Sequence, residues 1–231
     1  MVNLVPMPDW FLGKDILIDI FSLIVLITFF VLSMRGYKIN ENRKFLYLGI
    51  GFGLIALAGM GLIATKGVMY YNTSVTTSIG STIIKTGVVN STEVLYAMSF
   101  FFYRLFTLLG FYVIYRLPRQ EKSVGGDFAL VSLFIILSAF VSQEHSYIFH
   151  IATLLILVLI AGRYYKIYGK NGFLNTKILA IGFSILALSQ LLFAFSDEMM
   201  VVLGSALGLV GYSIFLGLII RILKSNSKAK I

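Results

Sequence analysis

The chain has 231 residues, of which 58% are hydrophobic, 15% aromatic and only 13% charged, and its formal net charge is +9. Soluble domains carry about 25% charged residues, so this composition excludes an ordinary soluble protein and indicates a membrane-embedded one. The chain has no cysteine, which excludes disulfides, thiol catalysis and cysteine-ligated metal sites.

Apolar runs along the chain predict an all-α polytopic membrane protein, a bundle of seven transmembrane helices that forms a single membrane domain with no soluble domain. In chain order, the expected spans are about 10–34, 45–65, 93–116, 128–142, 147–163, 177–196 and 199–223. The first span is not typical of a signal peptide, because it lacks a basic start and carries Asp15 and Asp19. We therefore expect it to be retained.

The basic residues predict the orientation of the bundle. Fifteen of the 19 Lys and Arg residues lie at the ends where the first, third, fifth and seventh spans finish. Since cytoplasmic loops of membrane proteins are rich in Lys and Arg, we expect the N-terminus outside and the C-terminus inside, in the plasma membrane. The positive charge then faces anionic headgroups of the lipid bilayer, and it gives no support for a nucleic-acid partner.

The longest loop, 66–92, is expected on the outer side. It is rich in Thr, Val, Ile and Tyr, and Gly80 lies near its middle. β-Branched and aromatic residues on both sides of a glycine are typical of two strands joined by a turn. The sequence therefore predicts an external β-hairpin-like loop over the outer end of the bundle.

Two halves of the chain share short patterns. The second span contains Gly51-Phe-Gly-Leu-Ile-Ala and the sixth contains Gly182-Phe-Ser-Ile-Leu-Ala, while the first and fifth spans end in Arg-x-Tyr-Lys at Arg35 and Arg163. The third and seventh spans both end at an arginine, namely Arg116 and Arg221. These patterns predict a possible parallel repeat of three helices with the fourth as a linker, a 3+1+3 plan.

This layout resembles that of SWEET-type sugar carriers, and seven helices with an outside N-terminus also resemble opsins and G-protein-coupled receptors. The resemblance is in layout only. The Pro-Gln pair of PQ-loop carriers is absent, since Pro6, Pro8 and Pro118 all lie outside the spans. Opsins need a lysine within the seventh helix, but Lys224 lies beyond the seventh span, which argues against retinal.

Arg104 lies at the centre of the third span. A guanidinium at this depth of a bilayer costs several kcal/mol, so it must face a partner or a wet cavity inside the bundle. Asp19 has a similar depth in the first span, and we predict an ion pair between Arg104 and Asp19. Two interpretations stay open: a structural pair that fixes the helix register, and an anchor for a ligand in a cavity.

Other candidate site residues are polar side chains within a span or at its outer end. These ligand or ion-pair candidates are Asp15, Glu93, His150, Gln190 and Tyr212. Each is either a packing or interfacial polar residue or part of the lining of a cavity around Arg104.

Catalysis is not expected, because the sequence shows no nucleophile–base pair, phosphate loop or metal cluster. The chain has two histidines, His145 and His150, whereas a seven-helix zinc hydrolase needs three. Five residues apart on a helix, they point in different directions, which argues against a haem held by both.

The leading hypothesis is a ligand-sensing or receptor-like module with an outward-facing polar pocket around Arg104 and Asp19. It would bind a small ligand from the outer side and signal to a membrane or cytoplasmic protein partner. A small-solute or proton-coupled transporter of 3+1+3 type and a non-catalytic accessory or scaffold subunit are the alternatives. The inner halves of the spans are almost wholly apolar, which favours sensing or scaffolding over transport.

Overall fold

The computed structural model describes residues 8–11, 13–41, 43–76, 82–116, 126–142, 145–195 and 197–228. In these residues the helices are η1 (Asp9–Phe11), α1 (Lys14–Asn40), α2 (Arg43–Thr76), α3 (Thr82–Arg116), α4 (Gly126–Val141), α5 (Ser146–Asn171), α6 (Leu174–Ala194) and α7 (Glu198–Lys228). Six of them are long and apolar enough to cross a membrane, and α4 has the shorter apolar stretch Val131–Val141. The predicted helical, multi-pass membrane bundle is confirmed.

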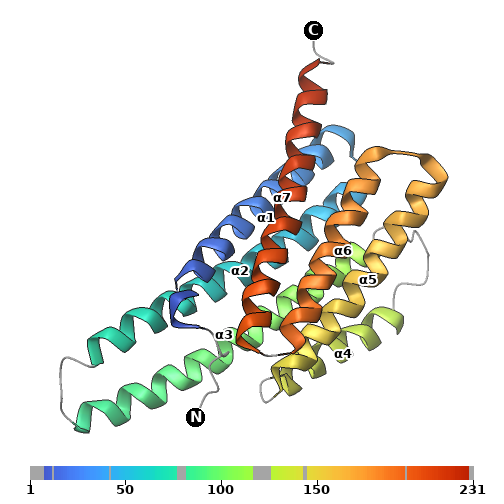
Figure 1. Cartoon of the computed structure of the whole chain (residues 1–231). Helices are drawn as coiled ribbons and strands as arrows, with labels where there is room; N and C mark the ends of the chain where they lie inside the picture. The colour runs from blue at the N-terminus through green and yellow to red at the C-terminus, as the bar shows by residue number, and fades with distance from the viewer. Residues whose placement is uncertain are drawn as a thin grey trace.

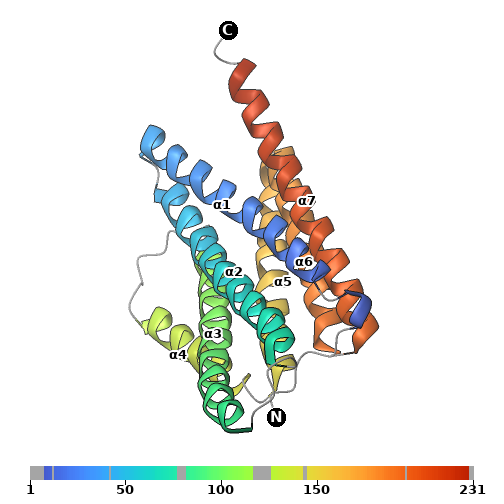
Figure 2. The ribbon, with the colours of Figure 1, turned by 90° about the vertical axis from the view of Figure 1, so that its left-hand side faces the viewer.

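Six helices form a ring. α1 packs on α2, α2 on α3, α3 on α5, α5 on α6, α6 on α7, and α7 returns to α1. α4 lies outside this ring against α3 and α5 (Figures 1 and 2). α1 begins at one end of the bundle and α7 finishes at the other; we refer to these as the N-terminal end and the C-terminal end (Figure 2).

A layer of phenylalanines fills the centre of the ring in its C-terminal half. Phe29 of α1 stacks on Phe52 of α2 with ring centroids 4.7 Å apart. Phe215 of α7 meets Phe29 at 5.6 Å and Phe183 of α6 at 5.0 Å. All four side chains are buried, so aromatic packing closes the middle of the bundle at this level.

The predicted β-hairpin over 66–92 is wrong. α2 continues to Thr76 and α3 begins at Thr82, so the described residues of this segment are helical and contain no strand. Together they form a long helical hairpin at the lower left of Figure 1. Extending an existing helix adds one backbone hydrogen bond per residue without a new nucleation step. β-Propensity reflects packing context more than an intrinsic preference, so it did not decide this segment.

α2 and α3 approach closely at two glycines. A Cβ atom on Gly51 would lie 2.5 Å from Ile114 Cγ1 and 2.9 Å from the carbonyl oxygen of Gly110. A Cβ atom on Gly110 would lie 2.5 Å from Ile55 Cγ1 and 2.7 Å from the carbonyl oxygen of Gly51. Only glycine allows two helix backbones to come this close, so this pair sets the spacing of α2 and α3.

Candidate functional site

Polar and charged side chains of the spans concentrate in the N-terminal half of the ring, on the opposite side of the phenylalanine layer from the C-terminal end. They come from five helices. The set comprises Asp15 and Asp19 of α1, Lys66 of α2, Arg104 of α3, His150 of α5 and Gln190 of α6. We call these six residues the polar set.

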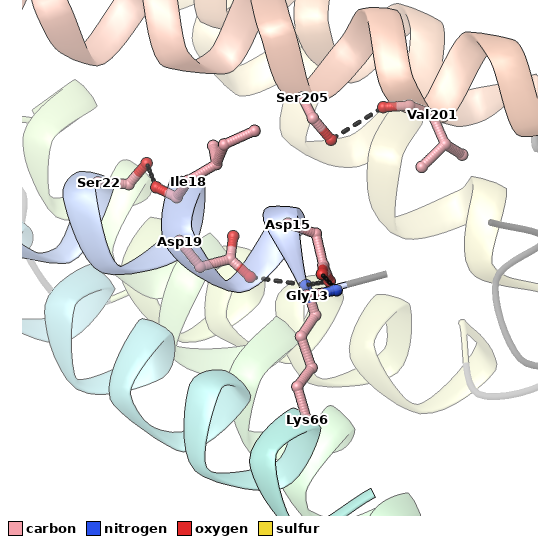
Figure 3. A network of polar contacts seen from close by, with 8 residues as sticks. All are labelled: Gly13, Asp15, Ile18, Asp19, Ser22, Lys66, Val201 and Ser205. Carbon is pink, nitrogen blue, oxygen red and sulfur yellow. Dashed lines mark hydrogen bonds and ion pairs between the residues drawn. The ribbon is translucent and has the colours of Figure 1, made fainter. Parts of the chain in front are cut away.

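Lys66 bridges the two aspartates of α1 (Figure 3). Its Nζ lies 2.6 Å from Asp19 Oδ2 and 2.9 Å from Asp15 Oδ2. Asp15 and Asp19 are four residues apart, so both face α2. The Asp15 side chain is 4% exposed, that of Lys66 18% and that of Asp19 28%. The Asp15 carboxylate also accepts a hydrogen bond from the backbone N–H of Gly13, which fixes it at the start of α1.

The predicted ion pair between Arg104 and Asp19 is not formed. Among the described residues, Lys66 takes both carboxylates of α1, and no carboxylate lies within 4.0 Å of the Arg104 guanidinium. The reason lies in the helix boundaries. Because α2 extends to Thr76, Lys66 lies in the helix next to α1, whereas Arg104 lies in α3, one place further round the ring.

Arg104 instead contacts the end of α4. Its Nη1 donates a hydrogen bond to the backbone carbonyl of Ser142, the residue after the last of α4. The guanidinium carbon also lies 5.9 Å from the ring centroid of Phe100 and 6.0 Å from that of Phe149. The last carbonyls of a helix lack intrahelical partners and carry the negative end of its dipole. A cation there is stabilising, so Arg104 caps α4 and ties it to α3.

His150 and Gln190 connect α5 to α6. His150 Nδ1 lies 2.8 Å from Gln190 Oε1. Because an amide oxygen only accepts, Nδ1 carries the hydrogen in this bond, and the neutral imidazole then presents Nε2 as an acceptor. The ring stands 5.2 Å from Phe149 and 5.4 Å from Phe193. Arg104 is near enough for its charge to act on this imidazole.

Two tyrosines, Tyr212 and Tyr103, lie near Asp19 of the polar set. Tyr212 of α7 packs on the central core, with its ring 6.4 Å from Phe215. Tyr103 of α3 packs on Phe149 at 5.5 Å, and Asp19 is close enough to act electrostatically on both phenols. Glu93 belongs to α3, but its side chain lies outside the described residues.

Sequence reasoning missed three of these contacts. It assigned Lys66 to a loop, gave no role to Ser142, and treated Tyr103 as one of a group of aromatic residues of the core, the interfacial belt or a pocket. A signal for Lys66 was present, because the apolar span of α2 runs to Val68 and so includes this residue. The carbonyl of Ser142 had no signal, since any residue at the end of α4 offers one.

The arrangement suits binding. Arg104 and Lys66 supply cationic donors, Asp19 and Asp15 supply acceptors, and His150 offers an imidazole nitrogen. Among the described residues, no group of three or more His, Asp or Glu side chains could hold a metal ion. Comparison with family models, curated proteins and solved structures gives no match to this chain.

Proposed function

We propose that this bundle is a ligand-sensing, receptor-like membrane module that binds a small molecule at its N-terminal end. One observation carries the proposal: the polar set lies in one half of the ring, and the phenylalanine layer closes the other half. Charged side chains within a membrane are costly and mark functional sites by default. Here Asp19, Lys66 and Arg104 share the end at which a ligand could enter.

The same asymmetry argues against a continuous route through the ring. A transported solute needs polar partners or water on both sides of a central site. The four rings of Phe29, Phe52, Phe183 and Phe215 are each at most 5% exposed. Opening a path past them would require separating helices that pack on one another across the whole ring.

The charge of the two ends supports an N-terminal end that faces outward. At the C-terminal end, cations from five helices gather, and Glu41 is the acidic side chain described among them. These cations are Arg35, Lys38, Arg43, Lys166, Lys170, Lys177, Arg221 and Lys224. By the positive-inside rule this end is cytoplasmic. A protein partner that reads out the bound state would meet this basic end.

Transport of 3+1+3 type is the second candidate, because one observation favours it. The glycine contacts between α2 and α3 have counterparts between α6 and α7. A Cβ atom on Gly211 would lie 2.8 Å from Leu186 Cδ2 and 3.6 Å from the carbonyl oxygen of Gly182, and one on Gly182 would overlap the ring of Phe215.

These contacts align the two halves residue by residue. Gly51 and Ile55 correspond to Gly182 and Leu186, and the pair Gly110 and Ile114 corresponds to Gly211 and Phe215. The alternation of buried and exposed residues is also identical over 51–60 and 182–191. A shared packing pattern supports a repeat of α1–α3 in α5–α7 and, with it, the internal repeats that many carriers have.

A thermal-shift screen of the purified protein against a small-molecule library tests the proposed function. We expect a ligand that raises the melting temperature of wild type but not of His150→Phe, which removes the bond to Gln190. Ser213→Ala is the matched control, because Ser213 is exposed and bonds its own helix at the Leu209 carbonyl; it should respond as wild type does. If no compound stabilises the protein, the accessory-subunit alternative is favoured. If a stabilising compound also crosses the membrane of proteoliposomes that contain the protein, transport is favoured.

A further inference from the structure

We infer that the ligand of this module is a small monocarboxylate, and that Arg104 is the residue that recognises it. The inference rests on the proposed function and names the chemical class of the ligand. The site lies where α3, α4 and α5 meet: Arg104 comes from α3, Ser142 follows α4, and Phe149 and His150 belong to α5.

Charge is the first argument. In the part of the chain that the structure describes, Lys66 is engaged by Asp15 and Asp19, which leaves Arg104 as a cation of the polar set without a carboxylate within 4.0 Å. A guanidinium without a counter-ion is costly at this depth. One negative charge on a ligand would offset it, whereas a phosphate would bring more negative charge than one guanidinium neutralises.

The shape of the guanidinium is the second argument. It has five N–H donors in a rigid fork, and among the described residues one of them is used, on the carbonyl of Ser142. The remaining donors match the two oxygens of a carboxylate in a bidentate pair. Within the described residues, Arg104 thus keeps donors that a ligand could take while it still caps α4.

The aromatic neighbours of Arg104 are the third argument. Phe100 and Phe149 stand 5.9 Å and 6.0 Å from the guanidinium carbon, and the imidazole of His150 lies beside Phe149. Two aromatic faces next to one cation suit a ligand with a charged head and a small apolar body.

The experiment is a titration of the purified, full-length protein with sodium acetate and sodium benzoate at constant ionic strength. We expect a saturable rise in melting temperature for wild type. Arg104→Lys keeps the charge but loses the fork, and it should weaken carboxylate binding at least about tenfold. Arg35→Lys makes the same change at an exposed residue of the C-terminal end, and it should bind as wild type does.

Two further measurements do not depend on how the Arg104 variant folds. Benzamide has the shape of benzoate without its charge, so wild type should not respond to it; an equal response would overturn the inference. Glu144 follows Ser142 by two residues in the sequence, and Glu144→Gln tests whether the chain's own carboxylate engages Arg104. Carboxylate binding in E144Q but not in wild type would also overturn the inference.

The outcome separates this inference from the proposed function. If carboxylates leave wild type unchanged while another compound of the library stabilises it, the ligand class is wrong and the sensing function stands. If neither carboxylates nor any library compound binds, both proposals fail.

Discussion

At the scale of single residues, the most consequential group is Lys66, because one ammonium stabilises two carboxylates in the interior of the bundle. Removing one partner of a buried ion pair leaves the other charge unsatisfied, which is more harmful than replacing all partners by neutral groups. Asp15 is almost fully buried, whereas Asp19 and Lys66 are partly exposed. The penalty is therefore below that of a fully buried pair.

The first prediction concerns Lys66→Met. It should destabilise the protein by about 2 kcal/mol, seen as a lower melting temperature in detergent. The triple variant Lys66→Met, Asp15→Asn and Asp19→Asn removes all three charges together, and it should recover most of this loss. A triple variant less stable than Lys66→Met would show that the two carboxylates gain more stabilisation from other groups than from Lys66.

The second prediction concerns Arg163 at the C-terminal end. This residue of α5 donates a hydrogen bond of 2.8 Å to the carbonyl oxygen of Tyr115 on α3, and its guanidinium carbon lies 3.6 Å from the centre of the Tyr115 ring. Stacking of this kind is specific to the planar guanidinium. Arg163→Lys and Tyr115→Leu should each destabilise by about 1 kcal/mol.

A double-mutant cycle measures whether these two effects share one origin. Arg163→Lys combined with Tyr115→Leu should destabilise by much less than the sum of the single effects, because either change alone removes the stack. Fully additive melting-temperature losses would contradict a direct interaction. Arg35→Lys, on an exposed residue of the same end, should leave the melting temperature unchanged.

The sequence could predict which charged residues need a partner, because the free energy cost of a buried charge depends on its place in an apolar run and not on the fold. A charge in the middle of an apolar run needs a partner in any fold, and this identified Arg104 and Asp19. Their partners were not predictable, because a partner depends on where neighbouring helices end. Lys66 became available to Asp19 through the length of α2, and the carbonyl of Ser142 became available to Arg104 through the end of α4.

At the scale of elements, α2 and α3 depend on the absence of two β-carbons. The third prediction is that Gly51→Ala and Gly110→Ala each destabilise by about 2 kcal/mol, because the new methyl group meets a backbone carbonyl oxygen within 3 Å and helices must separate. Gly61→Ala is the matched control on the same helix. Nothing lies within 4 Å of the position of its new Cβ, so this change should be neutral, or stabilising by up to about 1 kcal/mol through helix propensity.

The same substitutions test the repeat. If α6 and α7 copy the packing of α2 and α3, Gly211→Ala should also destabilise, but less than Gly110→Ala, since its Cβ would meet Leu186 Cδ2 at 2.8 Å and the carbonyl oxygen of Gly182 only at 3.6 Å. A neutral Gly211→Ala would show that the resemblance between the halves does not extend to their energetics.

Two sequence patterns suggested the proposed repeat, and the glycine contacts agree with the register of one pattern but not with that of the other. The motifs of 51–56 and 182–187 aligned the second and sixth spans as the contacts do, because small and large residues report packing directly. The terminal arginines Arg116 and Arg221 aligned the third and seventh spans one helical turn away from the register in which Gly110 matches Gly211. Arginines at a membrane boundary report its depth, and helices of different length reach it at different residues.

At the scale of the whole molecule, hydropathy predicted the approximate positions of the long helices that the described residues form, because a membrane demands long apolar helices whatever their packing. It did not predict that α4 lies outside the ring, since a short apolar helix has the same composition whether it belongs to the ring or packs on its outside. Nor did it predict that 69–76 continues α2 and that 82–92 belongs to α3, because these residues lie outside the apolar spans and leave no mark in hydropathy.

The fourth prediction is the orientation of the molecule in the membrane. The exposed cations of the C-terminal end predict that this end is cytoplasmic, whereas the exposed Glu198 begins α7 at the opposite end. Since the chain has no cysteine, single introduced cysteines can be labelled without background.

Glu198→Cys should react with a membrane-impermeant maleimide in intact cells, whereas Asn171→Cys at the end of α5 should react only after the cells are permeabilised. Both positions are exposed, so a difference between them reports sidedness and not burial. Labelling of both in intact cells would overturn the topology, because an α6 (Leu174–Ala194) that crosses the membrane must keep Asn171 and the start of α7 on opposite sides. The reverse pattern would invert the molecule and place the polar set, together with the proposed ligand, on the cytoplasmic side.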